Sequence, residues 1–238
     1  MTTTTPTQSA QKTALLIGAS RGLGYAMAEE LLKRAWHVMG TVRGSAQTPL
    51  HALAQRHPGR VDIEHVDITM PDHIAALRSR LDGRTFDLLF VNAGVTNNQS
   101  ETIGEVSTEE FTRVMVTNAL SPMRVLEALY DRVADGGTIG VMSSGQGSVA
   151  NNTNGMREVY RGSKAALNMF MRSFAARHGA DRHPMVLMAP GWVRTDMGGS
   201  DAPLTIEDSI PNVVNTLLAV HGNPGLQYLD YLGRTVPW

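Results

Sequence analysis

The chain has no cysteine among its 238 residues. This absence excludes disulfide bonds and cysteine nucleophiles, and it agrees with the reducing cytoplasm, which is the location that we expect. The eight histidines are scattered and form no H-E-x-x-H pattern, so the sequence predicts no metal site.

The sequence also lacks a large excess of charge of either sign and long apolar runs. The formal net charge is -1, and no run of lysine or arginine suggests a surface that follows phosphates, so we expect no nucleic-acid partner. No apolar stretch reaches the roughly 18 residues of a membrane span. The threonine-rich start lacks the charged and apolar regions of a signal peptide, and we interpret residues 1–11 as a disordered N-terminal segment.

The remaining length suits one domain, which we place at residues 12–238. Short apolar runs alternate with helical patterns, which predicts an α/β fold: a single Rossmann-type doubly wound parallel sheet of about seven strands with helices on both faces. The expected strands lie near 13–17, 37–42, 61–66, 86–91, 137–143, 184–189 and 226–230. The loops after the first, fourth and fifth strands then share the edge where such folds bind ligands.

A glycine-rich turn comes directly after the first expected strand. Gly18, Gly22 and Gly24 stand between an apolar run and a helical pattern that begins at Tyr25. Glycines permit a tight turn and close backbone approach, and the following helix start offers free amides to a pyrophosphate. The spacing G-x-x-x-G-x-G differs from the common dinucleotide fingerprint, and an ordinary strand-to-helix turn is the alternative.

Tyr160 and Lys164 are four residues apart, which places both side chains on one face of a helix. A phenol holds its proton up to a pKa near ~10 in water, and a neighbouring cation favours the phenolate. The pair therefore indicates a proton donor and acceptor, although a half-buried tyrosine beside a solvated lysine would share the same spacing.

Ser144 comes after an apolar run that begins near Thr138. A hydroxyl at a strand end can donate to a substrate carbonyl as negative charge builds on its oxygen. Serine pairs such as Ser143 and Ser144 are also common turn formers.

Together these residues resemble the short-chain dehydrogenase/reductase family. Further segments carry the resemblance in the same order along the chain: Asn92-Ala93-Gly94, Asn118 in Val116-Thr117-Asn118-Ala119, and Pro190-Gly191-Trp192-Val193-Arg194-Thr195. Within the family, the segments around Tyr160 and Gly191 and the ending Val236-Pro237-Trp238 look like the C-factor and sniffer-type carbonyl reductases.

The resemblance implies a catalytic set of Asn118, Ser144, Tyr160 and Lys164. It also implies cofactor contacts from residues spread over the expected sheet edge. These are Gly18, Ser20, Arg21, Gly22, Leu23, Gly24, Arg43, Asp67, Ile68, Asn92, Ala93, Gly94, Tyr160, Lys164, Pro190, Gly191, Val193 and Thr195.

The residue at the end of the second expected strand bears on the choice of cofactor. An acidic residue there would select NAD, but the chain reads Thr41-Val42-Arg43. Arg43 and Arg21 suit the 2′-phosphate of NADP, because guanidinium groups match phosphate oxygens. We therefore predict NADP(H), with NAD(H) as the alternative. Asp67 resembles the family position at the adenine, although a strand-end aspartate can instead cap a turn.

The predicted activity is hydride transfer between the nicotinamide and a small-molecule carbonyl or alcohol, with Tyr160 as general acid and base. Two alternatives remain: an NADPH-binding regulatory or signalling protein with little turnover, and an enzyme that works mainly as an alcohol dehydrogenase. The resemblance also implies a homodimer or homotetramer that pairs through long helices near 101–134 and 158–179.

The substrate itself is not specified by the sequence. The interval from Ser144 to Tyr160 is slightly longer than usual for the family, so we expect the stretch Gln146 to Arg157 to shape the pocket, together with the loop Gly198 to Thr205 and Met197. The apolar ending from Tyr228 to Trp238 is expected to join a subunit contact or to close a pocket.

Overall fold

A computed structural model describes residues 11–179 and 183–238 and contains one parallel sheet of seven strands in the order β3-β2-β1-β4-β5-β6-β7. The doubly wound α/β fold predicted from the sequence is confirmed. The strands are β1 (Thr13–Ile17), β2 (His37–Val42), β3 (Val61–His65), β4 (Phe86–Val91), β5 (Val133–Met142), β6 (Pro184–Ala189) and β7 (Gly225–Asp230).

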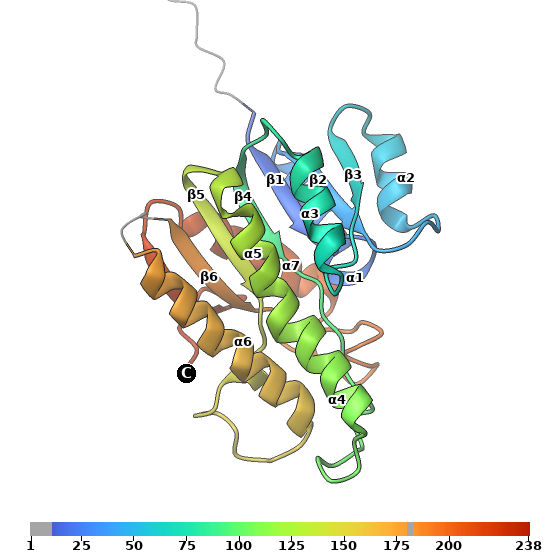
Figure 1. The fold of residues 1–238 in the computed structure, drawn as a ribbon, viewed down its shortest axis with the longest axis vertical. Helices are drawn as coiled ribbons and strands as arrows, with labels where there is room; N and C mark the ends of the chain where they lie inside the picture. The colour runs from blue at the N-terminus through green and yellow to red at the C-terminus, as the bar shows by residue number, and fades with distance from the viewer. Residues whose placement is uncertain (1–10, 180–182) are drawn as a thin grey trace, which may run out of the picture.

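Helices cover both faces of the sheet, and each face has its own apolar core (Figure 1). The side chains of β1 alternate between the two cores: Leu15 and Ile17 pack into one, and Ala14 and Leu16 into the other. The helices are α1 (Gly22–Lys33), α2 (Pro49–Arg56), α3 (Pro71–Arg80), α4 (Thr108–Met115), α5 (Ser121–Leu129), α6 (Glu158–Arg177) and α7 (Ile206–Ala219). Buried side chains of α3, α5 and α6 join the first core, and those of α1, α2 and α7 join the second.

The sequence placed two boundaries differently. The strand expected from 137 begins at Val133, and the helix expected over 101–134 begins only at Thr108, where the Ser107 hydroxyl accepts from the Glu110 amide. A π-helical turn, Val116–Leu120, then joins α4 to α5. Pro122 stands at the start of α5, where its missing N–H costs little.

Residues 1–10 of the expected disordered segment lie outside the described residues. Gln11 is described, and its side-chain amide donates to the Ala35 carbonyl at 3.3 Å. Within residues 11–179 and 183–238, no helix is both long and apolar enough to cross a lipid bilayer.

The strand order indicates where the sheet can bind a ligand. The chain runs outward from β1 to β3, returns to β4 on the other side of β1, and continues to β7. The carboxyl ends of β1 and β4 therefore meet at the point where the order reverses, which is where open α/β sheets bind ligands.

Candidate active site

A cavity of about 1030 Å³ opens at this edge. Its walls come from the turns after β1, β2, β4, β5 and β6, together with the start of α6 and the C-terminal segment. The volume is at the upper end of ligand cavities, and it is large enough for an extended ligand and a second small molecule.

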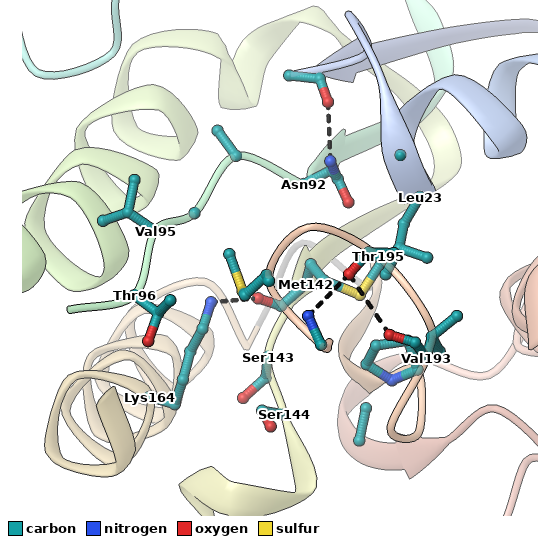
Figure 2. A pocket seen from close by; sticks show the side chains of 18 of the residues that line it. Leu23, Asn92, Val95, Thr96, Met142, Ser143, Ser144, Lys164, Val193 and Thr195 are labelled. Atoms are coloured by element: carbon teal, nitrogen blue, oxygen red, sulfur yellow. Dashed lines mark hydrogen bonds between the residues drawn. The ribbon is translucent and has the colours of Figure 1, made fainter. Parts of the chain in front are cut away.

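The glycine turn after β1 packs closely against the turn after β4. Gly18 has φ +87° and lies against Ala93, where an added Cβ would stand 2.9 Å from the Ala93 Cβ. The Asn92 side chain donates to the Gly18 carbonyl at 2.8 Å, as Figure 2 shows, and the Thr41 hydroxyl accepts from the Gly18 amide at 2.9 Å. These bonds fix the turn ahead of the N-terminus of α1, and the free amides there suit a pyrophosphate.

The end of the cavity at the glycine turn also carries the predicted phosphate-binding arginines. Arg43 lines it directly after β2. Arg21 also lines it, and its guanidinium is paired at 2.8 Å with Asp196 from the loop after β6, with both side chains strongly exposed.

Asp67 caps a turn and also lines this end of the cavity. Its carboxylate accepts from the Thr69 amide at 2.9 Å and from the Thr69 hydroxyl at 2.7 Å. Although burial opposes the charge most strongly, these bonds and nearby Arg43 hold the Asp67 pKa below its ordinary value.

Ser144 is placed at the end of β5 with its proton available. Its oxygen accepts from the Gln146 amide at 3.1 Å, and this bond begins a short helical turn, Gly145–Gly147. Because a hydroxyl has one donor and two acceptor positions, the O–H remains able to donate to a ligand.

Tyr160 and Lys164 are brought together on α6 as the spacing predicted. The Lys164 Nζ lies 5.8 Å from the centre of the Tyr160 ring and donates to the Met142 carbonyl at 2.9 Å (Figure 2). The lysine is only 3% exposed, and burial lowers its pKa to about 8.

Burial has the largest effect on the pKa of the Tyr160 phenol. Burial raises it above its ordinary value, and the Ser144 side chain and the Arg157 charge oppose that shift only in part. In the protein without ligand, the phenol therefore stays protonated at neutral pH.

Asn118 lies behind the cavity wall. Its amide exchanges hydrogen bonds of 2.8 Å with the N–H and C=O of Val95 and donates to the Ser163 hydroxyl at 3.0 Å. A Cβ on Gly94 would stand 3.4 Å from the Asn118 Oδ1 and 3.5 Å from the Lys164 Nζ, so both polar groups face the same small glycine.

The loop after β6 is held at several points. The Ser209 hydroxyl on α7 donates to the Pro190 carbonyl at 2.6 Å, and the Thr195 hydroxyl accepts from the Gly198 amide at 3.0 Å. Gly191, at φ +86°, leaves no space for a side chain, because an added Cβ would stand 2.5 Å from Leu204.

Most of the residues predicted for the site line this one cavity. The exceptions are Gly24, which packs behind Gly18 within α1, and Asn118. The pocket-shaping prediction holds for Gln146, Asn151, Arg157 and Met197. Of the loop 198–205, Gly198 is the one described residue that reaches the cavity.

Sequence reasoning missed the residues that support Ser144 from behind. The Tyr228 hydroxyl on β7 donates to the Ser144 carbonyl, and the Ser143 hydroxyl bonds to the Asn168 side chain at 2.6 Å. Tyr228 is 84 positions from Ser144 in the chain, and no local pattern signals the contact.

The sequence profile of the short chain dehydrogenase family matches residues 12–203. The chain belongs to this family of oxidoreductases. Within it, the chain resembles the branch of the C-signal protein and the sniffer-type carbonyl reductases.

Three relatives illustrate the similarity. A short-chain dehydrogenase/reductase from Burkholderia multivorans with bound NADP is 63% identical, with a TM-score of 0.95 over 96% of this chain and 100% of that one. A carbonyl reductase from Pseudomonas aeruginosa PAO1 in complex with NADP is 34% identical, with a TM-score of 0.88 over the same shares. The C-signal protein of Myxococcus xanthus is 37% identical over 64% of this chain and 92% of its own length.

Proposed function

We propose that this protein is an NADPH-dependent carbonyl reductase. The observation that carries the proposal is the meeting of Ser144, Tyr160 and Lys164 in one cavity with the glycine turn after β1. Two similar structures hold NADP, and the cavity has the glycine turn and the arginines that such a ligand needs.

When bound, NADPH supplies the hydride. Tyr160 donates a proton to the carbonyl oxygen of the substrate, and Ser144 donates a hydrogen bond to the same oxygen. Lys164 holds the nicotinamide ribose and, while protonated, stabilises the phenolate that remains. Asn118 holds the strand extension at Val95 in place beside Lys164 and orders the route by which the proton is resupplied.

Burial keeps the Tyr160 phenol protonated in the protein without ligand, and the protonated phenol is the form that can donate to a carbonyl oxygen.

Replacing Tyr160 with phenylalanine tests the proposal. Removing the hydroxyl removes the proton donor and leaves the ring, so we expect turnover of a carbonyl panel to fall by roughly 10²-fold or more, while fluorescence titration shows unchanged NADPH binding. Tyr25→Phe, on α1 and outside the cavity, is the matched control. Undiminished reduction by Tyr160→Phe would contradict the assignment, and NADPH binding without turnover in the wild type would favour the regulatory alternative.

Cofactor choice is tested separately at Arg43. Arg43→Asp removes a cation and adds an anion beside the expected 2′-phosphate, so NADPH affinity should fall at least tenfold more than NADH affinity, because a charge-assisted contact is worth about 1.5–3 kcal/mol. Titration of both cofactors measures the difference. Equal loss for the two would rule out a 2′-phosphate contact at this residue.

We also propose that the protein forms a homodimer or homotetramer through α4 and α6. Apolar side chains are exposed on both helices: Phe111 is 42% exposed, Met169 62% and Phe170 43%. Light scattering should show an oligomer that Phe170→Glu dissociates, because a charge in the interface would be buried without a partner.

A further inference from the structure

Arg157 stands at the substrate end of the cavity, three residues before Tyr160. It precedes α6 and lines the cavity together with Gln146 and Trp192. Its guanidinium carbon lies 6.0 Å from the centre of the Trp192 ring, and the Trp192 indole is itself held by a 2.7 Å bond to the Gly198 carbonyl. A guanidinium over a ring keeps its N–H groups free at the edge.

No carboxylate neutralises Arg157 within the described part of the chain. Three aspartates line the cavity, and each is already engaged. Asp196 pairs with Arg21, Asp230 pairs with Arg234 at 2.6 Å, and Asp67 binds Thr69. The neighbouring Glu158 turns away and accepts from the Ile103 amide.

The other arginines that line the cavity have a phosphate or structural role. Arg194 donates to the Ala202 carbonyl at 2.7 Å, and Arg234 is paired as above. Arg21 and Arg43 lie at the glycine turn and after β2, the cofactor end. Arg157 is therefore the half-buried cation that the cavity offers beside the phenol of Tyr160 with its donors unpaired among the described residues.

We propose that Arg157 binds a carboxylate of the substrate, so that the preferred substrates are oxo acids and not neutral ketones or aldehydes. The proposal rests on the carbonyl reductase function proposed above and adds the class of substrate. Guanidinium matches carboxylate geometry with two parallel hydrogen bonds, which orients the substrate as well as attracting it. Arg157 and Tyr160 line the same cavity, and the positive charge of Arg157 opposes the rise of the Tyr160 pKa.

The backbone conformation of Arg157 allows a substitution that removes its charge without straining the fold. Arg157 has φ +62°, a left-handed conformation that asparagine and glycine adopt more readily than arginine. Arg157→Asn therefore removes the cation and relieves the backbone, and its thermal midpoint should equal or exceed that of the wild type. Arg177→Gln, which removes an exposed cation at the far end of the same helix, is the matched control.

The test compares oxo acids of different spacer length with their methyl esters, namely 2-oxobutanoate, 4-oxopentanoate and 5-oxohexanoate, each assayed with NADPH. We expect kcat/KM of the wild type to favour at least one acid over its ester by tenfold or more. Arg157→Asn should lose at least tenfold on that acid and change less than twofold on its ester, and Arg177→Gln should change neither. Preference of the wild type for every ester, or equal loss on acid and ester in Arg157→Asn, would overturn the proposal.

A binding measurement separates this proposal from the reductase function. In the Tyr160→Phe background with saturating NADPH, calorimetric titration of the same acids should show binding that the added Arg157→Asn change weakens by tenfold or more. Such binding without wild-type turnover would sink the reductase function alone. Acid binding that is absent, or equal with and without Arg157, would sink the carboxylate site alone.

Discussion

At the scale of single residues, burial decides the chemistry more than spacing does. The spacing of Tyr160 and Lys164 predicted correctly that they would be neighbours, but it carries no information on how deeply each side chain is buried. In the folded chain both side chains lose water, and desolvation favours the neutral form of each: the Tyr160 pKa rises and the Lys164 pKa falls. A positively charged oxidised nicotinamide would be needed to reverse the first shift.

The buried charge of Lys164 should therefore destabilise the folded protein. Its folded pKa of about 8 lies below its ordinary 10.5. At pH 7 this shift lowers the free energy of unfolding by about 3 kcal/mol. The hydrogen bond to the Met142 carbonyl offsets about 1 kcal/mol of this loss. Lys164→Met should then raise the thermal midpoint by roughly 4–8 °C in the absence of cofactor while turnover is lost.

The pH dependence gives the control for this prediction. The unfolded chain binds more protons than the folded one between about pH 8 and 10.5, so the stability of the wild type should rise with pH relative to Lys164→Met across that window and the two should converge above it. Denaturant unfolding at pH 7, 9 and 10.5 measures the difference. A constant gap between the two proteins would show that the lysine is not buried in its charged form.

At the scale of elements, the glycines after β1 have two different roles, lining the cavity and allowing close packing of α1, and their spacing in the sequence does not distinguish these roles. Gly18 faces the cavity, but Gly24 does not, because it lies within α1 against the turn. A Cβ on Gly24 would stand 2.2 Å from the Gly18 carbonyl and 2.6 Å from the Asn92 side chain. The third glycine of the motif thus allows the helix to pack close to the turn, and a ligand need not touch it.

Gly24→Ala should consequently damage stability and binding together. The clash is with backbone and cannot be relieved by a rotamer, so we expect about 3 kcal/mol of destabilisation and loss of measurable NADPH binding. Gly104→Ala is the control, since a Cβ there meets nothing within 4 Å and the backbone has an ordinary φ. If Gly24→Ala folds with full stability and binds NADPH, the packing role is wrong.

At the scale of the whole molecule, Trp238 at the C-terminus holds the segment after β5 in place at the cavity wall. The Trp238 carbonyl accepts from the Ala150 amide at 3.0 Å, and its ring lies 5.4 Å from that of Tyr228, which holds the Ser144 carbonyl. The guanidinium carbon of Arg172 lies 4.5 Å from the centre of the Trp238 ring. The segment from Ser144 to Ala150 is therefore held between β7 and the chain end.

Trp238→Ala should loosen that segment without disturbing the cofactor end. Loss of the ring contacts removes about 1 kcal/mol of positioning energy, so KM for the carbonyl should rise about fivefold while the dissociation constant of NADPH stays unchanged. Leu232→Ala, in the same segment but 49% exposed, is the control. Weakened NADPH binding in Trp238→Ala would mean that the chain end supports the whole cavity and not one side of it.

The sequence by itself determined the sheet, the glycine turn and the pairing of Tyr160 with Lys164 on one helix, because each depends on short-range patterns: apolar alternation, φ-permissive glycines, and a four-residue helical spacing. Only the tertiary structure decided the direction of the pKa shifts of Tyr160 and Lys164, the support of Ser144 by Tyr228 and the pairing of Arg21 with Asp196. It also left the charge of Arg157 without a partner among residues 11–179 and 183–238. These properties depend on which distant segments exclude water from a group and which bring it a partner, and neither is encoded within any local stretch of the chain.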